Sequence, residues 1–411
     1  MWNQFTQSLT TEQQSAILEA AVKELESLQL SEIRNREHLL RRAQSAVQKA
    51  VAVVQAHAPA HVHEVLVQQV VARVGGFGFL DELLPPVRED LSEIALNPDG
   101  SLWILRKGAE SFEQLERSLP LSEVWRAVET LIAPLGRAVS ESSPSVNAKL
   151  PRRSLSPDFG GARVKILHPV IAPGLGYPSI NIRLFEPKPV SPRQIIEWGE
   201  APEPAVRGLV EAVRRGLRLL IIGGTATGKT TLLAALCDGI PKQARVVKIE
   251  DPEEIWIDHP NVVTIEARPA PPGSQVPSYL LKDGVDDALR MSPKWLVVGE
   301  VRTGDAGLAL FRAQMSDHPG LSTFHAEGPQ EAAFRMAVIL FADVGVRMEA
   351  AKAIFAQAVD VVVQIGWLKE RRQILGVWEV EPQLKGGEVV FRHVYKPGQE
   401  ALDAIERSRT I

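Results

Sequence analysis

Eight residues in the second half of the chain, GGTATGKT at positions 223–230, constrain its fold more than any other feature. They follow a short apolar run typical of a buried strand, Leu219–Ile222, and precede a segment with helical spacing that begins at Thr231. Glycines between a buried strand and a helix let successive backbone N–H groups curl around an anion, and the helix N-terminus adds positive potential. The pattern G-x-x-x-x-G-K-[ST] in this context predicts a phosphate-binding loop in an α/β sheet.

Each residue type in this loop has a chemical reason. The glycines let the backbone approach the phosphates, and the ammonium of Lys229 is expected to bridge the β- and γ-phosphates of a nucleoside triphosphate. The hydroxyl of Thr230 is expected to bind Mg²⁺. The sequence therefore predicts binding of a triphosphate together with Mg²⁺. The residues expected to bind the nucleotide are Gly223, Gly224, Thr225, Ala226, Thr227, Gly228, Lys229, Thr230 and Thr231.

Acidic residues follow a second strand-like run. A phosphate-binding loop needs such residues nearby, because carboxylates can bind the metal ion and orient the attacking water. Glu250 and Asp251 come directly after Val246–Ile249. Open α/β sheets bind ligands at the carboxyl ends of their strands, so carboxylates at this place favour a role in the reaction over that of a solvated strand end. We expect Asp251 to help hold Mg²⁺ and the cluster to supply negative charge beside the phosphates.

A third run, Trp295–Val298, ends in Gly299 and Glu300. Proteins with a phosphate-binding loop usually carry a metal-holding aspartate at the end of this strand, and here glycine stands in that place. We therefore expect Thr230 and water to carry more of the metal binding. Glu300 is expected to lie at the metal and to orient or polarise the attacking water.

A histidine ends a fourth strand-like run. His325 follows Leu321–Phe324, which places it near the carboxyl end of a strand in the predicted sheet. A lone histidine is usually structural. In this place its ring is instead expected to sense whether the γ-phosphate is present, because an imidazole can donate a hydrogen bond to a phosphate oxygen.

The rest of the chain divides where the periodicity changes. Helical spacing of apolar residues between 11 and 74 predicts a helical module at 1–86. A turn at 97–100 between alternating apolar residues predicts a β-hairpin, and mixed segments follow, which indicates a small α/β domain at 87–185. The proline-rich stretch 186–192 is the expected linker, and 193–411 alternates strands and helices around the phosphate-binding loop.

Composition excludes several classes of protein. The 46 basic and 50 acidic residues give a net charge of −4, which disfavours a dedicated nucleic-acid binder. The single cysteine, Cys237, allows neither an internal disulfide nor a zinc site of several thiolates, and it suits the reducing cytoplasm. The sequence shows no apolar stretch long enough to span a bilayer and no signal-peptide pattern. We therefore expect a cytoplasmic protein without a transmembrane segment.

Four of these stretches, in this order, resemble the motifs of the secretion-ATPase superfamily, the motors of type II and type IV secretion and of type IV pili. The stretch 223–230 resembles its Walker A box, 250–254 its Asp box, 298–300 its atypical Walker B box and 322–326 its His box. The preceding region is similar to the tight-adherence (Tad/Flp) pilus branch, and the stretches that carry this similarity are 81–97, 141–144, 162–164 and 180–183.

The resemblance implies an α/β fold with a RecA-like ATPase domain at the C-terminus and a small PAS-like domain before it. It implies a homohexamer that hydrolyses ATP with Mg²⁺ and works on inner-membrane platform proteins, through which it associates peripherally with the membrane. Catalytic roles are implied for Glu254, beside Glu250 and Glu300. Arg163 and Arg183 would reach the nucleotide phosphates from the N-terminal domain.

Other functions are open on the same core. A type IV secretion ATPase is the alternative nearest to a pilus motor. A nucleic-acid translocase is disfavoured by the acidic balance and by the lack of a basic stripe interleaved with aromatic residues, so no nucleic-acid partner is expected. A nucleotide-dependent scaffold with little turnover is disfavoured because Lys229, Thr230 and Glu300 are all retained.

Overall fold

The computed structural model describes residues 9–25, 28, 36–54, 58–133, 136–152, 159–268, 270 and 275–408. The chain forms two compact units, Met1–Phe185 and Glu186–Ile411. Within the described ranges, no helix combines the length and the apolar character that crossing a membrane requires.

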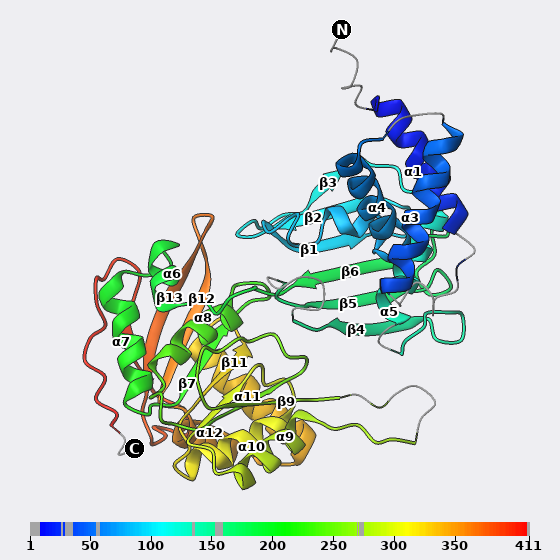
Figure 1. Cartoon of the computed structure of the whole chain (residues 1–411). Coiled ribbons are helices and arrows are strands. Elements are labelled where there is room, and N and C mark those ends of the chain that lie inside the picture. The colour runs from blue at the N-terminus through cyan, green and yellow to red at the C-terminus, as the bar shows by residue number, and fades with distance from the viewer. Residues whose placement is uncertain are drawn as a thin grey trace. The chain divides into compact units, whose positions relative to one another are not determined.

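Helices begin the first unit: α1 (Thr11–Leu25), α3 (Arg36–Val53) and α4 (Ala60–Gly75) (Figure 1). Their apolar side chains recur at helical spacing and pack into a core of their own, in which Ile17, Val47 and Val70 are fully buried. The described part of the segment thus has helices where the spacing between residues 11 and 74 predicts them.

The remainder of the first unit is built on a six-stranded antiparallel sheet in the order β3-β2-β1-β6-β5-β4. The strands are β1 (Leu91–Leu96), β2 (Leu102–Arg106), β3 (Glu113–Leu115), β4 (Ser145–Leu150), β5 (Ala162–Leu167) and β6 (Ser179–Leu184). Helix α5 (Leu121–Ile132) covers one face with an apolar stripe of five buried residues. The short helix η1 (Gly78–Glu82) buries Phe79 and Leu80 in the same core, so the chain enters this core before the expected boundary at residue 86.

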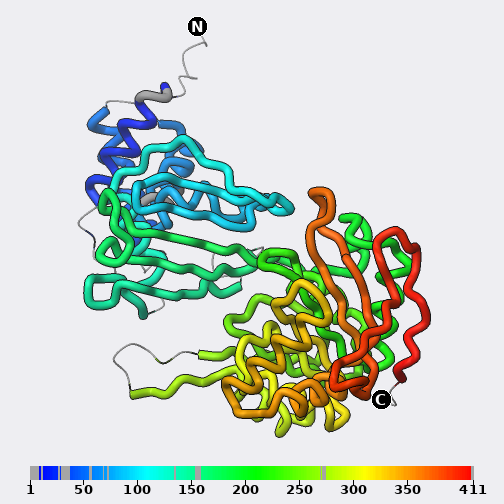
Figure 2. The backbone as a smooth tube through the Cα atoms, turned by 180° about the vertical axis from the view of Figure 1, so that it is seen from behind, coloured from blue at the N-terminus to red at the C-terminus, as the bar shows by residue number. Residues whose placement is uncertain are grey.

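The second unit is built on an eight-stranded sheet in the order β14-β13-β12-β7-β11-β10-β8-β9 (Figures 1 and 2). The six strands from β12 to β9 run parallel, and β13 and β14 are antiparallel at one edge. The strands are β7 (Leu219–Gly223), β8 (Val246–Glu250), β9 (Val262–Glu266), β10 (Trp295–Val298), β11 (Gly320–His325), β12 (Val361–Leu368), β13 (Arg371–Val380) and β14 (Phe391–Tyr395). Every residue of β7 is buried, as the apolar run before the loop predicts.

Helices cover both faces of this sheet, with α7 on one side of the strands and the group of α10 to α12 on the other (Figure 1). The core on one face includes residues of α6 (Pro192–Glu197), α7 (Glu203–Arg214), α8 (Lys229–Leu236) and η3 (Cys237–Gly239). The core on the other face includes residues of α9 (Leu281–Ala288), α10 (Gly304–Met315), α11 (Pro329–Val344) and α12 (Met348–Ala358), with η4 (Leu289–Met291) after α9. The predicted α/β class is therefore confirmed.

The expected linker at 186–192 is partly anchored to the second unit. Val190 is buried in that unit's core. Ser191 begins α6 with a capping box, in which its hydroxyl accepts the N–H of Gln194 and the Gln194 side chain accepts the N–H of Ser191 at 2.9 Å. The boundary between the units lies between Phe185 and Glu186, at the start of the proline-rich stretch.

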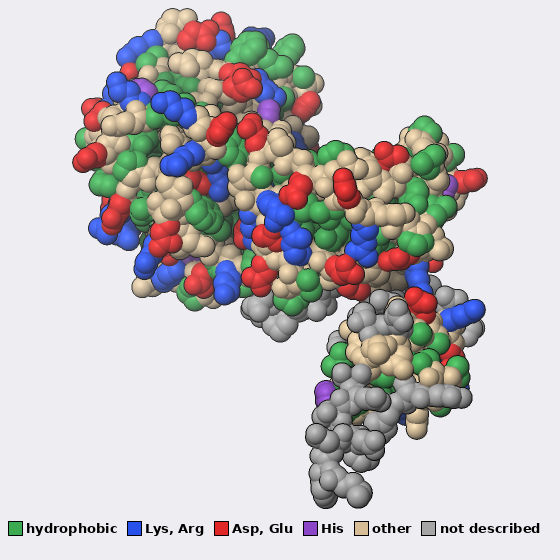
Figure 3. Space-filling model, turned by 90° about the horizontal axis from the view of Figure 1, so that it is seen from above, with side chains coloured by type: hydrophobic (Ala, Val, Ile, Leu, Met, Phe, Trp, Pro, Cys, Tyr) green, Lys and Arg blue, Asp and Glu red, His purple; other side chains and the backbone are tan. Residues whose placement is uncertain are grey.

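Charged side chains are not separated by sign on the surface. On the face shown in Figure 3, basic and acidic side chains are intermixed. Ion pairs at exposed positions include Arg193 with Glu197, at 2.7 Å. Such exposed pairs contribute about 0–1 kcal/mol each. Among the described residues on this face there is no continuous basic stripe of the kind that follows a nucleic-acid backbone.

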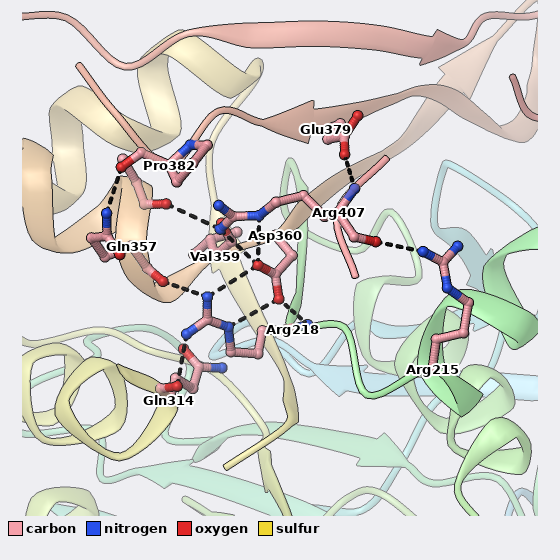
Figure 4. Close-up of polar contacts among 10 residues, drawn as sticks. Arg215, Arg218, Gln314, Gln357, Val359, Asp360, Glu379, Pro382 and Arg407 are labelled. Carbon is pink, nitrogen blue, oxygen red and sulfur yellow. Dashed lines mark hydrogen bonds and ion pairs between the residues drawn. The ribbon is translucent and has the colours of Figure 1, made fainter. Parts of the chain in front are cut away.

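A buried polar network fixes the amino-terminal ends of two central strands (Figure 4). Arg218 precedes β7 and Asp360 precedes β12, and both side chains are almost fully buried. Asp360 accepts hydrogen bonds from the backbone N–H and the Nε of Arg218, at 2.9 and 3.0 Å, and from the Nε of Arg407, at 2.8 Å. Arg407 thereby holds the C-terminal segment against the sheet. Because the phosphate-binding loop follows the other end of β7, the network supports the strand that carries the loop.

Candidate active site

The loop between β7 and α8 has the shape that an anion needs. Ala226 and Gly228 have left-handed backbone angles, with φ of 58° and 89°, and such residues turn successive N–H groups toward one concavity. The φ of Gly228 favours glycine, and a Cβ there would lie 2.7 Å from Nη1 of Arg372, so a larger residue would displace this side chain. Helix α8 begins at Lys229, so its N-terminus points into the same concavity.

Lys229 lies against the loop and is 8% exposed. Its Nζ donates hydrogen bonds to the carbonyl oxygens of Gly223, at 3.1 Å, and Gly224, at 2.6 Å. The hydroxyl of Thr227 donates to the same carbonyl of Gly224, at 2.9 Å. These bonds hold the ammonium inside the curve of the loop, where its charge adds to that of the helix N-terminus. The loop therefore fits the phosphates of a nucleotide.

The metal expected at this loop would draw few ligands from the protein. Thr230 and Thr231 lie in the first turn of α8, and both are half-buried. In the part of the chain that the structure describes, no three His, Cys, Asp or Glu residues gather into a metal site. Mg²⁺ usually takes one or two protein groups and completes its shell with phosphates and water, so a threonine hydroxyl beside a phosphate loop fits it.

Glu250, the last residue of β8, turns its carboxylate into the unit and is 2% exposed. Its Oε1 accepts the N–H groups of Glu254, at 3.1 Å, and Ile255, at 2.9 Å, and its Oε2 lies 2.8 Å from Nζ of Lys248. Burial is the largest influence on the pKa of Glu250 and raises it, against the opposite effect of Lys248 and the two N–H groups. Its carboxylate is thus held by groups of the protein itself, and the catalytic role expected for Glu250 stays a prediction.

Lys248 ties the acidic turn after β8 to the strand. Its side chain is 3% exposed, and its Nζ lies 3.1 Å from Oε1 of Glu253 and donates to the carbonyl oxygen of Ile255. The other expected residues of the turn lie nearer the surface: Asp251 is exposed and Glu254 is half-buried. Asp251 is thus accessible to a metal, whereas Glu250 is enclosed.

Glu250 also explains the glycine at 299. A Cβ at this position would lie 3.0 Å from Cγ and 3.3 Å from Oε1 of Glu250, closer than side chains in a well-packed interior normally approach. The strands β8 and β10 are paired, so the Glu250 side chain fills the space that an aspartate at 299 would need. Where other proteins with this loop usually have an aspartate at the end of the strand, this chain has Gly299, and the carboxylate of Glu250 on the neighbouring strand β8 lies next to it.

Glu300 follows at the carboxyl end of β10, and its side chain is 29% exposed. Its Oε2 accepts a hydrogen bond from Nε of Arg302 at 2.6 Å. Because Arg302 is mostly exposed, the pair contributes about 0–1 kcal/mol, and Glu300 can exchange this partner at little cost. The hydroxyl of Thr323 donates to the carbonyl oxygen of Gly299 at 2.6 Å, which fixes the backbone before Glu300 to β11.

His325 is the last residue of β11, and it pairs in register with Gly223 of β7. Its side chain is half-buried. The predicted place of His325, at the carboxyl end of a strand in the sheet, is confirmed. The register brings it beside the first residue of the phosphate-binding loop, on the side of β7 that carries β10 and Glu300. Its role as a γ-phosphate sensor stays a prediction.

Arg163 and Arg183 belong to the first unit, where the structure brings them together. They are directly opposite each other in the paired strands β5 and β6. Residues that flank them, such as Val164 and Ile182, are buried in the core, so the two arginines share the other face of the sheet. The Cβ atoms of directly opposite residues lie about 4.5–5.5 Å apart. The register thus brings two positively charged residues to the same place on the sheet, and their expected role at the phosphates stays a prediction.

Two residues that the structure places near the loop and the acidic turn, Arg372 and Lys248, have no role predicted from the sequence. Lys248 carries a usable signal, because a lysine within the apolar run Val246–Ile249 indicates a buried ionic partner. Arg372 carries none. It lies near Gly228 of the loop only because β12 pairs with β7 and β13 pairs with β12.

Comparisons with known proteins agree with this architecture. A family model described as "Type II/IV secretion system protein" matches residues 124–365. An uncharacterized protein of Methanocaldococcus jannaschii is 34% identical over 195 residues, which are 47% of this chain and 33% of that protein, so the chain spans only a third of its length. The "Probable conjugal transfer protein TrbB" of Sinorhizobium fredii is 29% identical over 294 residues, covering 70% of this chain and 83% of that protein. Among solved structures, the pilus retraction motor PilT with bound ADP has a similar fold, with a TM-score of 0.51 and 16% identity over 76% of this chain and 82% of that chain.

Proposed function

Because this chain belongs to the type II/IV secretion system protein family, we propose that it is an ATPase that converts hydrolysis into mechanical work. The observation that carries the proposal is one edge of the second unit's sheet. There the phosphate-binding loop, His325 and Glu300 lie at the carboxyl ends of the neighbouring strands β7, β11 and β10. A triphosphate in the loop would have the ammonium of Lys229 at its phosphates. The imidazole of His325 and the carboxylate of Glu300 would lie on one side of those phosphates.

The chain's own groups suggest the steps of hydrolysis. The loop N–H groups and Lys229 hold the β- and γ-phosphates and stabilise the charge that develops there. Glu300 orients a water molecule and accepts its proton while the water oxygen bonds to the γ-phosphorus. The bond from phosphorus to the β–γ bridging oxygen breaks, and ADP leaves with the electron pair. Thr230 and Asp251 would hold Mg²⁺, which supplies Lewis-acid stabilisation of the phosphate oxygens.

The mechanical part of the proposal rests on the family and on the paired arginines. We propose a homohexamer in which Arg163 and Arg183 reach the nucleotide phosphates from the N-terminal domain and release them after hydrolysis. The load would be an inner-membrane platform of a Tad/Flp-like pilus, which the cytoplasmic protein would bind peripherally. The charged, planar guanidinium suits contacts that must form with a phosphate and be released again.

Type IV secretion is the second candidate, because one relative is named as a conjugal transfer protein. Deleting the gene in its host separates the two. Loss of surface pili with unchanged secretion or conjugal transfer supports the pilus motor, and the reverse supports the secretion ATPase. A nucleic-acid translocase has less support, because the net charge is −4 and the face in Figure 3 mixes both signs.

Nucleotide binding tests the proposal at its base. Lys229→Ala should weaken ATP binding by about tenfold to a hundredfold, the effect of losing charge-assisted bonds to phosphate. Lys242→Ala is the matched control, since Lys242 is a lysine of the same unit, about half exposed, beside Asp238. Calorimetric titration with ATP and Mg²⁺ measures both. Unchanged affinity in Lys229→Ala would overturn the assignment of the phosphate site.

A further inference from the structure

The flank of the phosphate-binding loop that faces away from Glu300 carries a second cation. Strand β12 lies beside β7 on the side opposite β11, and it continues into β13 through a turn at Lys369 and Glu370, which both have positive φ. Arg372, near the start of β13, reaches the loop, since a Cβ at Gly228 would lie 2.7 Å from its Nη1. No residue of this hairpin has a part in the hydrolysis proposed for the loop, Glu300 and Lys229.

The guanidinium of Arg372 is held in a fixed orientation. Its Nε donates to Oε1 of Glu200 at 2.5 Å, and its Cζ lies 5.5 Å from the centre of the Trp198 ring. The Glu200 side chain is 1% exposed, and the backbone oxygen of Glu200 accepts the N–H of Ile374 at 2.8 Å, which anchors this segment to β13. A buried carboxylate and an aromatic face together restrict where the planar group can turn.

The end of the guanidinium that points away from Glu200 is available to a ligand. The Nε atom of Arg372 has a hydrogen-bond partner. Among the described residues, neither of its two Nη atoms has one. The side chain is 23% exposed. Nη1 is also the atom of Arg372 nearest the Cβ position of Gly228. Donors of a charged group thus lie at the edge of the loop, partly open to solvent.

The strand order fixes which part of a nucleotide would meet these donors. His325 and Glu300 lie on the β11 and β10 side of β7, where the γ-phosphate and the attacking water are placed by the proposed function. The other end of the same molecule, with its ribose and base, would then extend toward β12 and β13. Oxygen and nitrogen acceptors of a ribose and a purine match the donors that Arg372 offers.

We propose that Arg372 binds the nucleoside end of the nucleotide, and that Glu200 and Trp198 are positioning residues that orient its guanidinium. The proposal rests on the proposed function, because it takes the phosphate position from Lys229 and Glu300. It assigns to the β12–β13 hairpin the recognition of ribose and base, which the phosphate-binding loop itself does not provide.

Comparing two ligands separates the nucleoside contact from the phosphate contacts. ATP and inorganic tripolyphosphate are titrated calorimetrically into the full chain with Mg²⁺. Arg372→Ala should raise the Kd for ATP by about tenfold or more, the effect of a lost charged hydrogen bond, and change that for tripolyphosphate by less than about twofold. Arg371→Ala is the matched control, because Arg371 is the exposed neighbour on β13, and neither Kd should change.

Two more variants keep the test independent of folding. Arg372→Lys retains the charge but not the planar fork, and should bind ATP more weakly than the wild type while melting at the same temperature. Glu200→Gln keeps the shape of the positioning residue and should raise KM for ATP with little change in kcat, because it frees the orientation of Arg372.

Either of two results would overturn the proposal. One is an equal loss of ATP and tripolyphosphate binding in Arg372→Ala, which would mean that Arg372 acts on the phosphates or on the loop. The other is unchanged binding of both ligands. The variant Lys229→Ala separates a failure of the Arg372 proposal from a failure of the phosphate site, because Lys229→Ala should lose binding of both ATP and tripolyphosphate. If Lys229→Ala retains both, the proposed function fails, and the assignment of Arg372 fails with it.

Discussion

Replacing Lys248 by methionine should destabilise the second unit by about 3–5 kcal/mol, the cost of breaking a buried ion pair by removing one partner. Nζ lies 2.8 Å from Glu250 and 3.1 Å from Glu253, and the side chain is 3% exposed. Methionine keeps the length of the stem but leaves the Glu250 carboxylate buried without its cation. Because domains are stable by only about 5–15 kcal/mol, such a loss is a large part of the total.

Labelling of Cys237 during urea unfolding measures this loss in the unit where it occurs. Cys237 is the single cysteine of the chain and lies in the core of the second unit. A short pulse of thiol reagent at each urea concentration reports the fraction of molecules in which that core is open. The Lys248→Met midpoint should fall without a change in slope. Lys294→Met, at an exposed lysine just before β10, should shift stability by no more than about 0.5 kcal/mol.

A double-mutant cycle tests the cause of the loss. If the unpaired Glu250 carboxylate is responsible, Lys248→Met combined with Glu250→Gln should lose less than the sum of the single variants, with a coupling of about 1–3 kcal/mol. Strict additivity, or a loss below about 1 kcal/mol in Lys248→Met, would refute the reasoning, since that is the size of an ordinary hydrogen bond.

Other regions give independent tests. Gly299→Asp should cost about 1–3 kcal/mol in urea unfolding, because its Cβ would lie 3.0 Å from Cγ of Glu250; added to Glu250→Ala, where that space is open, the same substitution should cost much less, and an unaffected Gly299→Asp would contradict the packing argument. Arg407→Ala should speed hydrogen exchange in residues 399–408 and leave ATP turnover unchanged, whereas unaltered protection would show that the network in Figure 4 does not hold the C-terminal segment. Burial raises the pKa of the Cys237 thiol, so the folded chain should resist iodoacetamide at about pH 8 and react only when unfolded; rapid labelling of the native protein would contradict its burial.

The phosphate-binding loop could be predicted because all its determinants are local. A buried strand, a glycine-rich turn and a helix beginning at Lys229 are adjacent in sequence, and each leaves its own pattern. The positions of Glu300 and His325 could also be predicted. Each comes at the end of an apolar run, and parallel strands have their carboxyl ends at the same edge of a sheet.

The orientation of side chains at that edge could not be predicted. Every residue of β8 is buried, so alternation gives no sign that Glu250 turns toward Lys248 and the turn after the strand. The contact of Arg372 with Glu200 joins residues 172 positions apart and depends on the pairing of β12 with β7. Arg163 and Arg183 are adjacent only through the register of β5 and β6.

Turnover of ATP by Glu300→Gln tests the central claim most directly. Glutamine keeps the shape of the side chain but cannot accept a proton from water, so hydrolysis should fall by about 10²–10⁴-fold while ATP binds with wild-type affinity. Glu327→Gln is the matched control, because Glu327 is an exposed carboxylate just after β11, and its turnover should equal that of the wild type. Loss of turnover confined to Glu300→Gln would agree with an ATPase that uses this carboxylate. Full turnover in Glu300→Gln would contradict it.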